Sequence, residues 1–319
     1  MFALSGALSS YPRLVWFRWI EIILAVTCFH FFAYITNDLI DLNLDKTSHL
    51  RANDPLVRGL INTRTALIFA LIQYPLCILF CILIKITFQS MVALTGAFIF
   101  ILAYNIWGKR ISFPILTDII QGLSWAFLYI FGASAFNVSN IRFFWIGSAF
   151  IITYIVMING IHGSLRDIYS DYAYNINTTA ISLGVKLRSV DSLVLSTKLK
   201  IYAGGLQIIL MILPFVQVWN NREEYHSGQL YVLLPILVLL EFFTTVLAQQ
   251  AIQKNKLSEM IAPGTIHAFL FLSIFFISIL LFRVNWLTFC FVLFLFSAPA
   301  LAGGWLINSF SSVISNDQE

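Results

Sequence analysis

The chain has 319 residues, of which 59% are hydrophobic and 11% are charged. A soluble domain has about 25% charged residues, and the mean hydropathy of +0.86 excludes both a soluble globular protein and a disordered one. The net charge of +4 comes from 19 Lys and Arg against 15 Asp and Glu, scattered along the chain, which argues against a nucleic-acid-binding surface. We therefore expect an integral membrane protein that contacts lipid and no nucleic acid.

Nine apolar segments are long enough to cross a membrane. A span needs about 20 mostly apolar residues, and lipid favours helices because their backbone polar groups are paired internally. In chain order the segments are 14–36, 65–86, 90–107, 114–137, 141–162, 199–219, 229–250, 265–282 and 286–308. No linker or repeat divides them. The sequence therefore predicts an all-α, multi-spanning transmembrane bundle of about nine helices, with residues 1–319 forming a single polytopic membrane domain.

The loops between these spans alternate between the two membrane sides and carry unequal positive charge. Thirteen of the 19 Lys and Arg lie on the side reached after the first span, and six lie on the other side. The two longest loops, 37–64 and 163–198, are both on the more basic side. Cytoplasmic loops carry an excess of Lys and Arg, so we expect both long loops to face the cytoplasm.

The first long loop begins with oxygen-bearing side chains spaced by four residues. Asn37, Asp41 and Asp45 share one face of a helix, because four residues advance about 400° around its axis. Asp38 lies about 100° away. Carboxylates are unfavourable at a helix C-terminus, where the dipole is negative, so a bound cation explains them better than a solvated helix end. Three such ligands in a row suit a hard cation such as Mg²⁺.

A second acidic pair, Asp167 and Asp171, follows the fifth predicted span on the same membrane side. Its spacing again places two carboxylates on one helix face, although this pattern alone is weak evidence. Two facing acidic helix ends can hold Mg²⁺ ions around a diphosphate. Carboxylates cannot bind a diphosphate without metal between them. The two segments together therefore predict one diphosphate site.

Basic residues flank both acidic segments. Guanidinium groups bind phosphate oxygens in bidentate fashion, so these residues are candidates for binding a diphosphate. They also belong to the cytoplasmic excess of positive charge, and the sequence leaves both interpretations open. The candidates are Arg51, Arg58, Lys109, Arg110 and Arg166.

The order of these motifs resembles the UbiA superfamily of intramembrane prenyltransferases. NDxxDxxxD is followed by PLVRG at 55–59, by the segment from Tyr104 to Lys109, and by DxxxD leading into TTAISLG at 178–184. The resemblance covers roughly residues 20–280. It implies a helical bundle with a cavity open to the cytoplasm, in which Mg²⁺ ions bridge the acidic motifs to a prenyl diphosphate.

The resemblance also implies roles for individual residues. The metal-site residues are Asn37, Asp41, Asp45, Asp167 and Asp171, and the four aspartates among them are the catalytic residues. The substrate-binding residues are Arg51, Arg58, Tyr104, Lys109, Arg110 and Arg166, with Tyr104 lining the site.

The sequence departs from the family pattern at three places. Members often have Gly where this chain has Asn175, which tolerates a left-handed backbone. Gly163 stands where many members carry a further polar or acidic residue, so the second segment has fewer ligands. Only 36 residues precede Asn37, so we expect the family's first helix to be missing or truncated. We expect either an apolar span encoded upstream of Met1 or a compensating role for 286–308.

The function that the sequence favours is a Mg²⁺-dependent prenyltransferase, facing the cytoplasm, that moves an isoprenoid group from a prenyl diphosphate to an aromatic or lipid acceptor. A terpene cyclase of the same superfamily is the alternative, since it ionises the same substrate and an internal alkene then captures the cation. A membrane transporter is the second alternative, and it predicts no need for Mg²⁺. The acceptor, the prenyl chain length and the oligomeric state do not follow from the sequence.

Three sets of side chains within the spans have two interpretations. Trp125, Phe127 and Tyr129 are either packing residues or aromatic contacts for an isoprenoid tail and its cation. Glu241 lies in the middle of a span, where a carboxylate is costly unless it is paired. His162 precedes the second acidic segment and is either a structural residue or a base.

Overall fold

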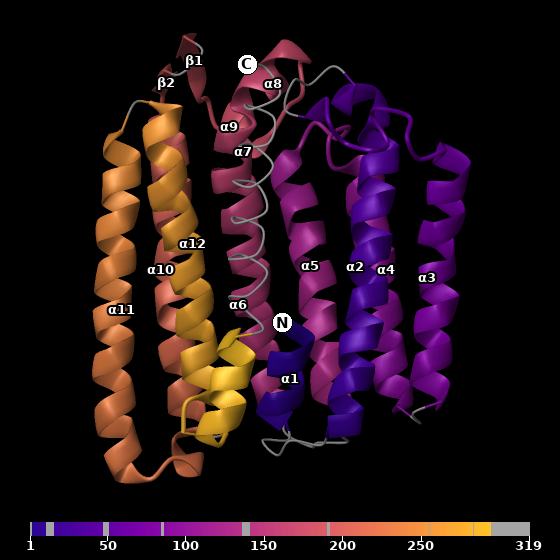
Figure 1. Ribbon diagram of the computed structural model, residues 1–319. Helices are drawn as coiled ribbons and strands as arrows, with labels where there is room; N and C mark the ends of the chain where they lie inside the picture. Colours follow the sequence, from indigo (N-terminus) through magenta and orange to yellow (C-terminus); the bar gives the residue numbers. More distant parts are fainter. Residues whose placement is uncertain are drawn as a thin grey trace, which may run out of the picture.

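The computed structural model describes residues 2–10, 16–46, 51–83, 86–135, 141–189, 192–254, 256–282 and 284–294. Eight helices in this part of the chain are long and apolar enough to cross a membrane. They form an upright bundle with α3 and α11 at opposite edges (Figure 1). Seven of the spans lie in α2 (Trp16–Asp45), α3 (Thr63–Leu83), α4 (Phe88–Trp107), α5 (Pro114–Ser134), α10 (Thr197–Asn220), α11 (Ser227–Gln253) and α12 (Leu257–Leu280), and the eighth, Phe144–Arg166, begins in α6 (Ile141–Met157).

The prediction of a multi-spanning helical bundle is confirmed, with adjustments at both ends of the chain. The predicted ninth span, 286–308, lies largely outside the described residues. Its described part, 286–294, is helical. The predicted first span, 14–36, is too short, because α2 continues to Asp45. Its 30 residues extend over about 45 Å at 1.5 Å per residue. Since the hydrocarbon layer is about 30 Å thick, α2 is long enough to carry its acidic end beyond the apolar core.

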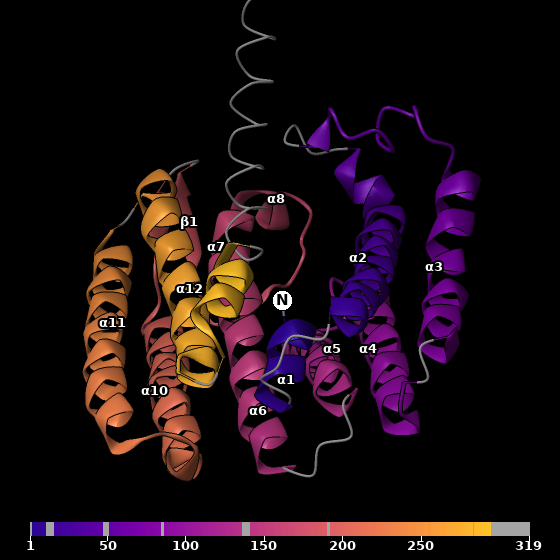
Figure 2. The ribbon, with the colours of Figure 1, turned by 60° about the horizontal axis from the view of Figure 1, so that its bottom comes forward.

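A short helix that the sequence did not predict, α1 (Phe2–Ser10), lies inside the bundle (Figure 2). Two glycines allow its backbone to touch α5. A Cβ on Gly6 would collide with the Tyr129 carbonyl, and a Cβ on Gly132 would collide with the Ala3 carbonyl. Apolar residues lie all around α1, as is typical of a buried helix. The sequence therefore lacks the alternation of apolar and polar faces by which a surface helix is predicted.

The packing of the bundle separates a core from a lipid-facing surface. Phe150 of α6 and Phe275 of α12 stack with their ring centroids 4.5 Å apart, and both rings are buried. On α3 and α11, large apolar side chains such as Ile68 and Val238 remain exposed. In a helix that crosses a membrane, such side chains meet lipid rather than water.

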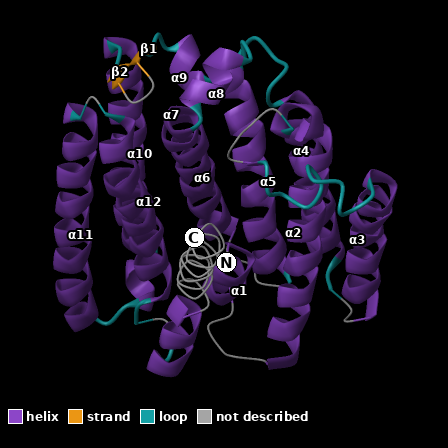
Figure 3. Ribbon diagram, turned by 45° about the horizontal axis from the view of Figure 1, so that its top comes forward, coloured by secondary structure: helices purple, strands orange, loops and turns teal. Residues whose placement is uncertain are grey.

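The described parts of the two longest loops lie at the same end of the bundle, which we call the loop end (Figure 3). After α6 the chain continues through the π-helix η2 (Ile158–Gly163), α7 (Ser164–Arg166), α8 (Ile168–Ala173) and α9 (Thr179–Ser182), and then the hairpin of β1 (Lys186–Ser189) and β2 (Ser192–Val194). The 3₁₀ turn η3 (Arg222–Glu224) lies at the opposite end. The predicted arrangement of the long loops on one side of the bundle is therefore confirmed.

Candidate active site

The first acidic segment, residues 37–45, forms the last turns of α2 at the loop end, and its carboxylates are held by cations from other elements. Asp41 accepts a hydrogen bond of 2.6 Å from the Lys109 ammonium, which lies just after α4. Arg51, in the loop after α2, lies 4.0 Å from Asp38 and 3.0 Å from Asp54. These cations oppose the unfavourable field of the helix C-terminus that the sequence indicated.

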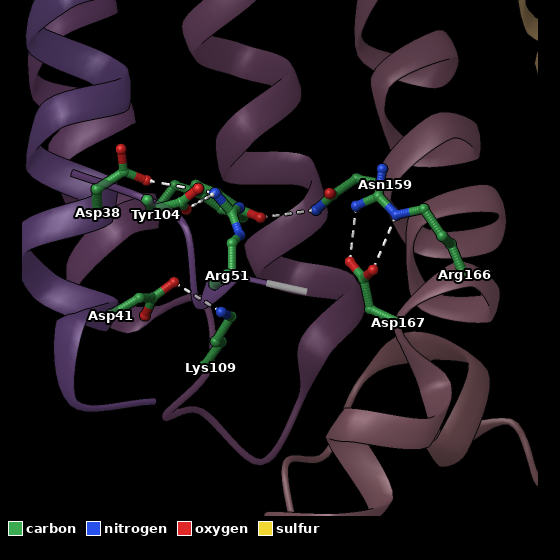
Figure 4. A network of polar contacts seen from close by, with 9 residues as sticks. Asp38, Asp41, Arg51, Tyr104, Lys109, Asn159, Arg166 and Asp167 are labelled. Carbon is green, nitrogen blue, oxygen red and sulfur yellow. Dashed lines mark hydrogen bonds and ion pairs between the residues drawn. The ribbon is translucent and has the colours of Figure 1, made fainter. Parts of the chain in front are cut away.

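The second acidic segment, residues 167–171, lies across from the first (Figure 4). Asp167 has φ −93° and ψ 3° and separates α7 from α8. The Asp171 amide still donates to the Asp167 carbonyl at 3.0 Å, so the predicted one-turn spacing is retained. Arg166 donates two hydrogen bonds, of 2.8 and 2.7 Å, to the Asp167 carboxylate.

Lys109 connects the two acidic segments electrostatically. Burial raises the pKa of Asp171 to about 7, and the nearby charge of Asp167 adds to the increase, whereas the positive charge of Lys109 opposes it. Lys109 is thus within electrostatic reach of Asp171 while it contacts Asp41 directly. A cation bound between the segments would lower the pKa of Asp171 in the same way, because an opposite charge favours the ionised carboxylate.

A buried carboxylate that the sequence analysis missed anchors the second segment. Asp118 of α5 accepts hydrogen bonds from Asn159 at 2.8 Å and from Thr179 at 2.5 Å. Asn159 also donates to the Tyr104 hydroxyl at 2.9 Å. Gly160 makes room for this contact, because a Cβ there would be 2.6 Å from an Asp118 oxygen. An acidic residue inside an apolar span is the signal that could have identified Asp118.

The remaining predicted site residues lie at the loop end but differ in their surroundings. Asn37 is half-buried one turn before Asp41. Asp45 is buried and lies within electrostatic reach of Arg51 and Lys109. The Arg58 and Arg110 side chains are exposed, and among the described residues neither is hydrogen-bonded or ion-paired with either acidic segment.

The motif glycines and Asn175 occupy special backbone positions at the same end. Asn175 has a φ of 54°, in the left-handed region of the backbone. Glycine adopts this conformation without strain and asparagine tolerates it, so either residue suits the position. Gly59 and Gly184 also have positive φ, of 70° and 87°. The loops are further held by the Tyr172 hydroxyl, which donates to the Val185 carbonyl at 2.5 Å.

Tyr129 and Glu241 are buried within the bundle, whereas Trp125 and Phe127 are half-buried. Tyr129 is fully buried and lies 3.3 Å from the Ser9 hydroxyl, so it is a packing residue. Phe127 stacks on Phe100, and Trp125 meets Phe29 edge to face. The Glu241 side chain is 4% exposed, and one of its carboxylate oxygens has no partner among the described residues.

The donor chemistry of the two segments fits Mg²⁺, although they do not form a closed cage. In the described part of the chain, no three His, Cys, Asp or Glu side chains are close enough to hold a metal by themselves. Both segments present oxygen ligands, which Mg²⁺ prefers. Mg²⁺ sites commonly use one or two carboxylates and complete the shell with water and substrate phosphate oxygens. An open arrangement of this kind suits a diphosphate that supplies the remaining ligands.

Comparisons with known proteins agree with this fold. The model of the UbiA prenyltransferase family matches residues 1–256, and the chain belongs to that family. A UbiA homologue from Aeropyrum pernix K1 is similar in structure, with a TM-score of 0.64 and 17% identity over 86% of this chain and 92% of that one. A search of curated protein sequences finds no match.

Two further solved structures share the fold. A digeranylgeranylglyceryl phosphate synthase superposes with a TM-score of 0.66 at 13% identity, over 89% of this chain and 92% of that one. A UbiA homologue from Archaeoglobus fulgidus, bound to GPP and Mg²⁺, superposes with a TM-score of 0.61 at 17% identity, over 87% and 93%. At these identities the superpositions establish the shared fold.

Proposed function

We propose that this protein is a Mg²⁺-dependent prenyltransferase that moves an isoprenoid group from a prenyl diphosphate to an acceptor held within the membrane. The observation that carries the proposal is that two acidic segments lie across from each other at one end of an apolar bundle (Figure 4), with Lys109 paired to Asp41 and within electrostatic reach of Asp171. Membership of the UbiA prenyltransferase family and the GPP- and Mg²⁺-bound relative support it.

In this proposal the charged residues of the loop end bind the diphosphate. Asn37, Asp41 and Asp45 on one side and Asp167 and Asp171 on the other hold Mg²⁺, which supplies charge neutralisation for the leaving diphosphate. The diphosphate oxygens are bound by Arg51, Arg58, Lys109, Arg110 and Arg166. Lys109 and Arg166 are ion-paired with aspartates. Binding of a diphosphate with its metal exchanges those carboxylate contacts for contacts to phosphate.

Tyr104 has a positioning role in the proposed site. Its hydroxyl accepts a hydrogen bond from Asn159, which Asp118 fixes from the other side. This chain of contacts sets the distance between the end of α4 and the π-helix, and therefore between the two acidic segments. The apolar walls of the bundle exclude water from the allylic cation or cation-like transition state.

A terpene cyclase of the same family would use the same ionisation. Edge-to-face contacts such as Trp125 with Phe29, at 5.6 Å between centroids, provide the aromatic faces that stabilise cations in such a reaction. We therefore propose to incubate membranes containing the protein with farnesyl or geranylgeranyl diphosphate and Mg²⁺, without added acceptor. Recovery of unchanged substrate supports the transferase, whereas a cyclic hydrocarbon or alcohol identifies a cyclase.

The transporter alternative is tested by the same preparation. Removing Mg²⁺ with a chelator is expected to abolish consumption of the prenyl diphosphate when a cell extract supplies the acceptor. The matched variants are Asp41→Ala, in the proposed site, and Glu223→Ala, an exposed residue at the opposite end. Equal consumption by both variants, or consumption that is independent of Mg²⁺, contradicts the proposed function.

We also propose that the loop end faces the cytoplasm, because thirteen of the 19 Lys and Arg lie on that side. Single cysteines placed at Ala52 and Ala173 are expected to react with a membrane-impermeant maleimide only when the cytoplasmic side is accessible. A cysteine at Arg222 is expected to react only from the other side. Labelling of Ala52 and Ala173 from opposite sides contradicts a shared site.

A further inference from the structure

The β-hairpin and the start of α10 enclose a cavity at the loop end that none of the proposed site residues lines. The hairpin lies near the end of α10, in the half of the bundle away from α2 (Figure 1 and Figure 3). The cavity has a volume of about 220 Å³. Pockets for drug-sized ligands measure about 300–1,000 Å³, so this one suits a single small group. Its lining residues are Arg188, Ser192, Leu193, Val194, Leu195 and Lys200.

Local contacts fix the hairpin against α10 and turn its basic residues outward. The Ser196 hydroxyl donates to the Leu183 carbonyl at 2.5 Å and, as the N-cap of α10, accepts a hydrogen bond from the first turn of that helix. Leu193 of β2 is buried and pairs with Leu187 of β1. Because side chains alternate along a strand, Arg188 lies on the outer face, and it is exposed. The cavity walls therefore have a defined arrangement.

Three elements each supply a hydrogen-bond donor to the cavity. They are the guanidinium of Arg188 on β1, the hydroxyl of Ser192 on β2 and the ammonium of Lys200 on α10. Among the described residues, none of the three side chains has a hydrogen bond or an ion pair. Residues 184–200 include four basic residues and one acidic residue, Asp191, which lies outside the described residues. The cavity therefore suits an anion with several acceptor oxygens, such as a phosphate group.

The cavity lies at the border of the lipid-facing surface. The membrane span of α10 begins at Thr197, so Lys200 belongs to its first turn. Ile201, the next residue, is 71% exposed, and Ile208 further along α10 is also exposed. In a spanning helix such side chains meet lipid. A phosphate bound in the cavity would therefore lie at the level of the lipid headgroups, with acyl chains able to follow the exposed face of α10.

We propose that this cavity binds the phosphate of an anionic phospholipid from the leaflet at the loop end. Arg188 and Lys200 pair with the phosphate oxygens, and the Ser192 hydroxyl donates a further hydrogen bond. A free phosphate has the same chemistry, but only a lipid also covers the apolar surface that begins at Ile201. The bound lipid holds the hairpin and the start of α10 at the membrane surface. This site is separate from the proposed diphosphate site and does not depend on the proposed prenyltransferase function.

The test counts the lipids that stay bound to the purified full-length chain. The protein in detergent is titrated with phosphatidylserine or phosphatidylcholine, and bound lipids are counted by native mass spectrometry. We expect one phosphatidylserine to bind more tightly than any phosphatidylcholine. The double variant Arg188→Ala with Lys200→Ala is expected to weaken binding of that phosphatidylserine about tenfold or more, because each basic residue near anionic lipid contributes several-fold.

Two matched variants separate the cavity from general charge. Lys186→Ala with Lys198→Ala removes the same charge from the same segment, at exposed residues that do not line the cavity. It is expected to keep the affinity for phosphatidylserine within about twofold, because salt screens charges that make no direct contact. Ser192→Ala removes a donor and no charge, and it is expected to weaken binding about threefold or more. The Tm of each variant in detergent verifies its fold.

Four outcomes overturn the proposal. The first is equal binding of the two lipids by the wild type, and the second is equal weakening by the two double variants, which general electrostatics would explain. The third is binding of inorganic phosphate, measured by calorimetry, without binding of phosphatidylserine, since the cavity then takes a soluble anion. The fourth is loss of the lipid in Lys109→Ala, which would place it at the candidate active site. If the Arg188 and Lys200 double variant does not fold, unchanged binding in Ser192→Ala overturns the proposal.

Discussion

The two acidic segments of the candidate site are built in different ways. The first lies on α2, an uninterrupted helix of 30 residues, and receives Lys109 from a distant part of the chain. The second lies where the chain breaks into the short helices α7 and α8, and its cation, Arg166, is the residue next to Asp167. A long helix positions the first segment, whereas the second is supported by hydrogen bonds from Asn159 and Thr179, on either side of it in the sequence, to the buried Asp118.

This difference shows that equal carboxylate spacing does not require equal support. A straight helix carries its side chains at fixed angles, so the first segment needs only cations that offset the helix dipole. The second segment follows a π-helix and a break at Asp167, and buried polar contacts must replace the missing helical continuity. The two segments should therefore respond similarly to loss of a carboxylate and differently to loss of their supports.

Loss of one carboxylate from either segment should have the largest effect. Asp41→Ala and Asp167→Ala are each expected to lower Mg²⁺-dependent release of diphosphate by about a hundredfold or more, because each removes a ligand that supports several kcal/mol of transition-state stabilisation. Initial rates at saturating Mg²⁺ measure this, with Glu223→Ala as the control. Full activity in both variants would refute the shared metal site.

Loss of Asp118 should weaken only the second segment. Asp118→Leu leaves Asn159 and Thr179 without their acceptor, and each unsatisfied buried donor costs about 1–3 kcal/mol. We expect a clear decrease in the apparent Tm in detergent and a looser π-helix, seen as faster hydrogen exchange around Asn159. Asp118→Asn, which keeps one acceptor, should have a milder effect. If α2 is equally protected from hydrogen exchange in the wild type and both variants, the first segment does not depend on Asp118. Faster exchange of α2 in Asp118→Leu would contradict the separate support of the two segments.

Loss of the cation paired with each segment should have a smaller effect, and the effect should differ between the two segments. Lys109→Ala is expected to weaken binding of geranylgeranyl diphosphate about tenfold, or about 1.4 kcal/mol, because Lys109 contacts Asp41 and is within electrostatic reach of Asp171. Arg166→Ala should weaken it by less, since Arg166 is more exposed and its ion pair is with the adjacent Asp167. Titration at constant Mg²⁺ measures both. Lys256→Ala, a cation at the same end, is the control for net charge, and an equal loss in that variant would reduce the Lys109 effect to general electrostatics.

The smallest expected effect concerns the loop after α8. Asn175→Ala should destabilise the protein by about 1 kcal/mol, because alanine resists the left-handed backbone at φ 54°. Asn175→Gly should leave stability nearly unchanged. Thermal denaturation of the two variants beside the wild type measures the difference. A larger loss in the glycine variant would show that the Asn175 side chain, rather than its backbone, matters.

Much of the fold was accessible from the sequence because membrane spans have a strong compositional signal. Apolar runs of about 20 residues predict helices in lipid, and the four-residue spacing of Asn37, Asp41 and Asp45 predicts their shared face. The positions of α3 to α6, α10 and α11 therefore agree with the predicted spans within several residues, whereas α2 ends later and α12 begins earlier than predicted. The short helix α1 escaped detection, since nine residues are too few for a span and its composition lacks a polar face.

The sequence by itself determined the class of protein, the helical bundle and the residues of both acidic segments, because composition and spacing are local properties of the chain. Only the tertiary structure decided which cation meets which carboxylate, as with Lys109 and Asp41, which are 68 positions apart. It also revealed the buried contacts of Asp118 and a series of hydrogen bonds from His162 through His267 and Gln207 to Thr244. These contacts join helices that are distant in sequence, and helix packing, which no local pattern encodes, brings their polar groups within hydrogen-bond distance.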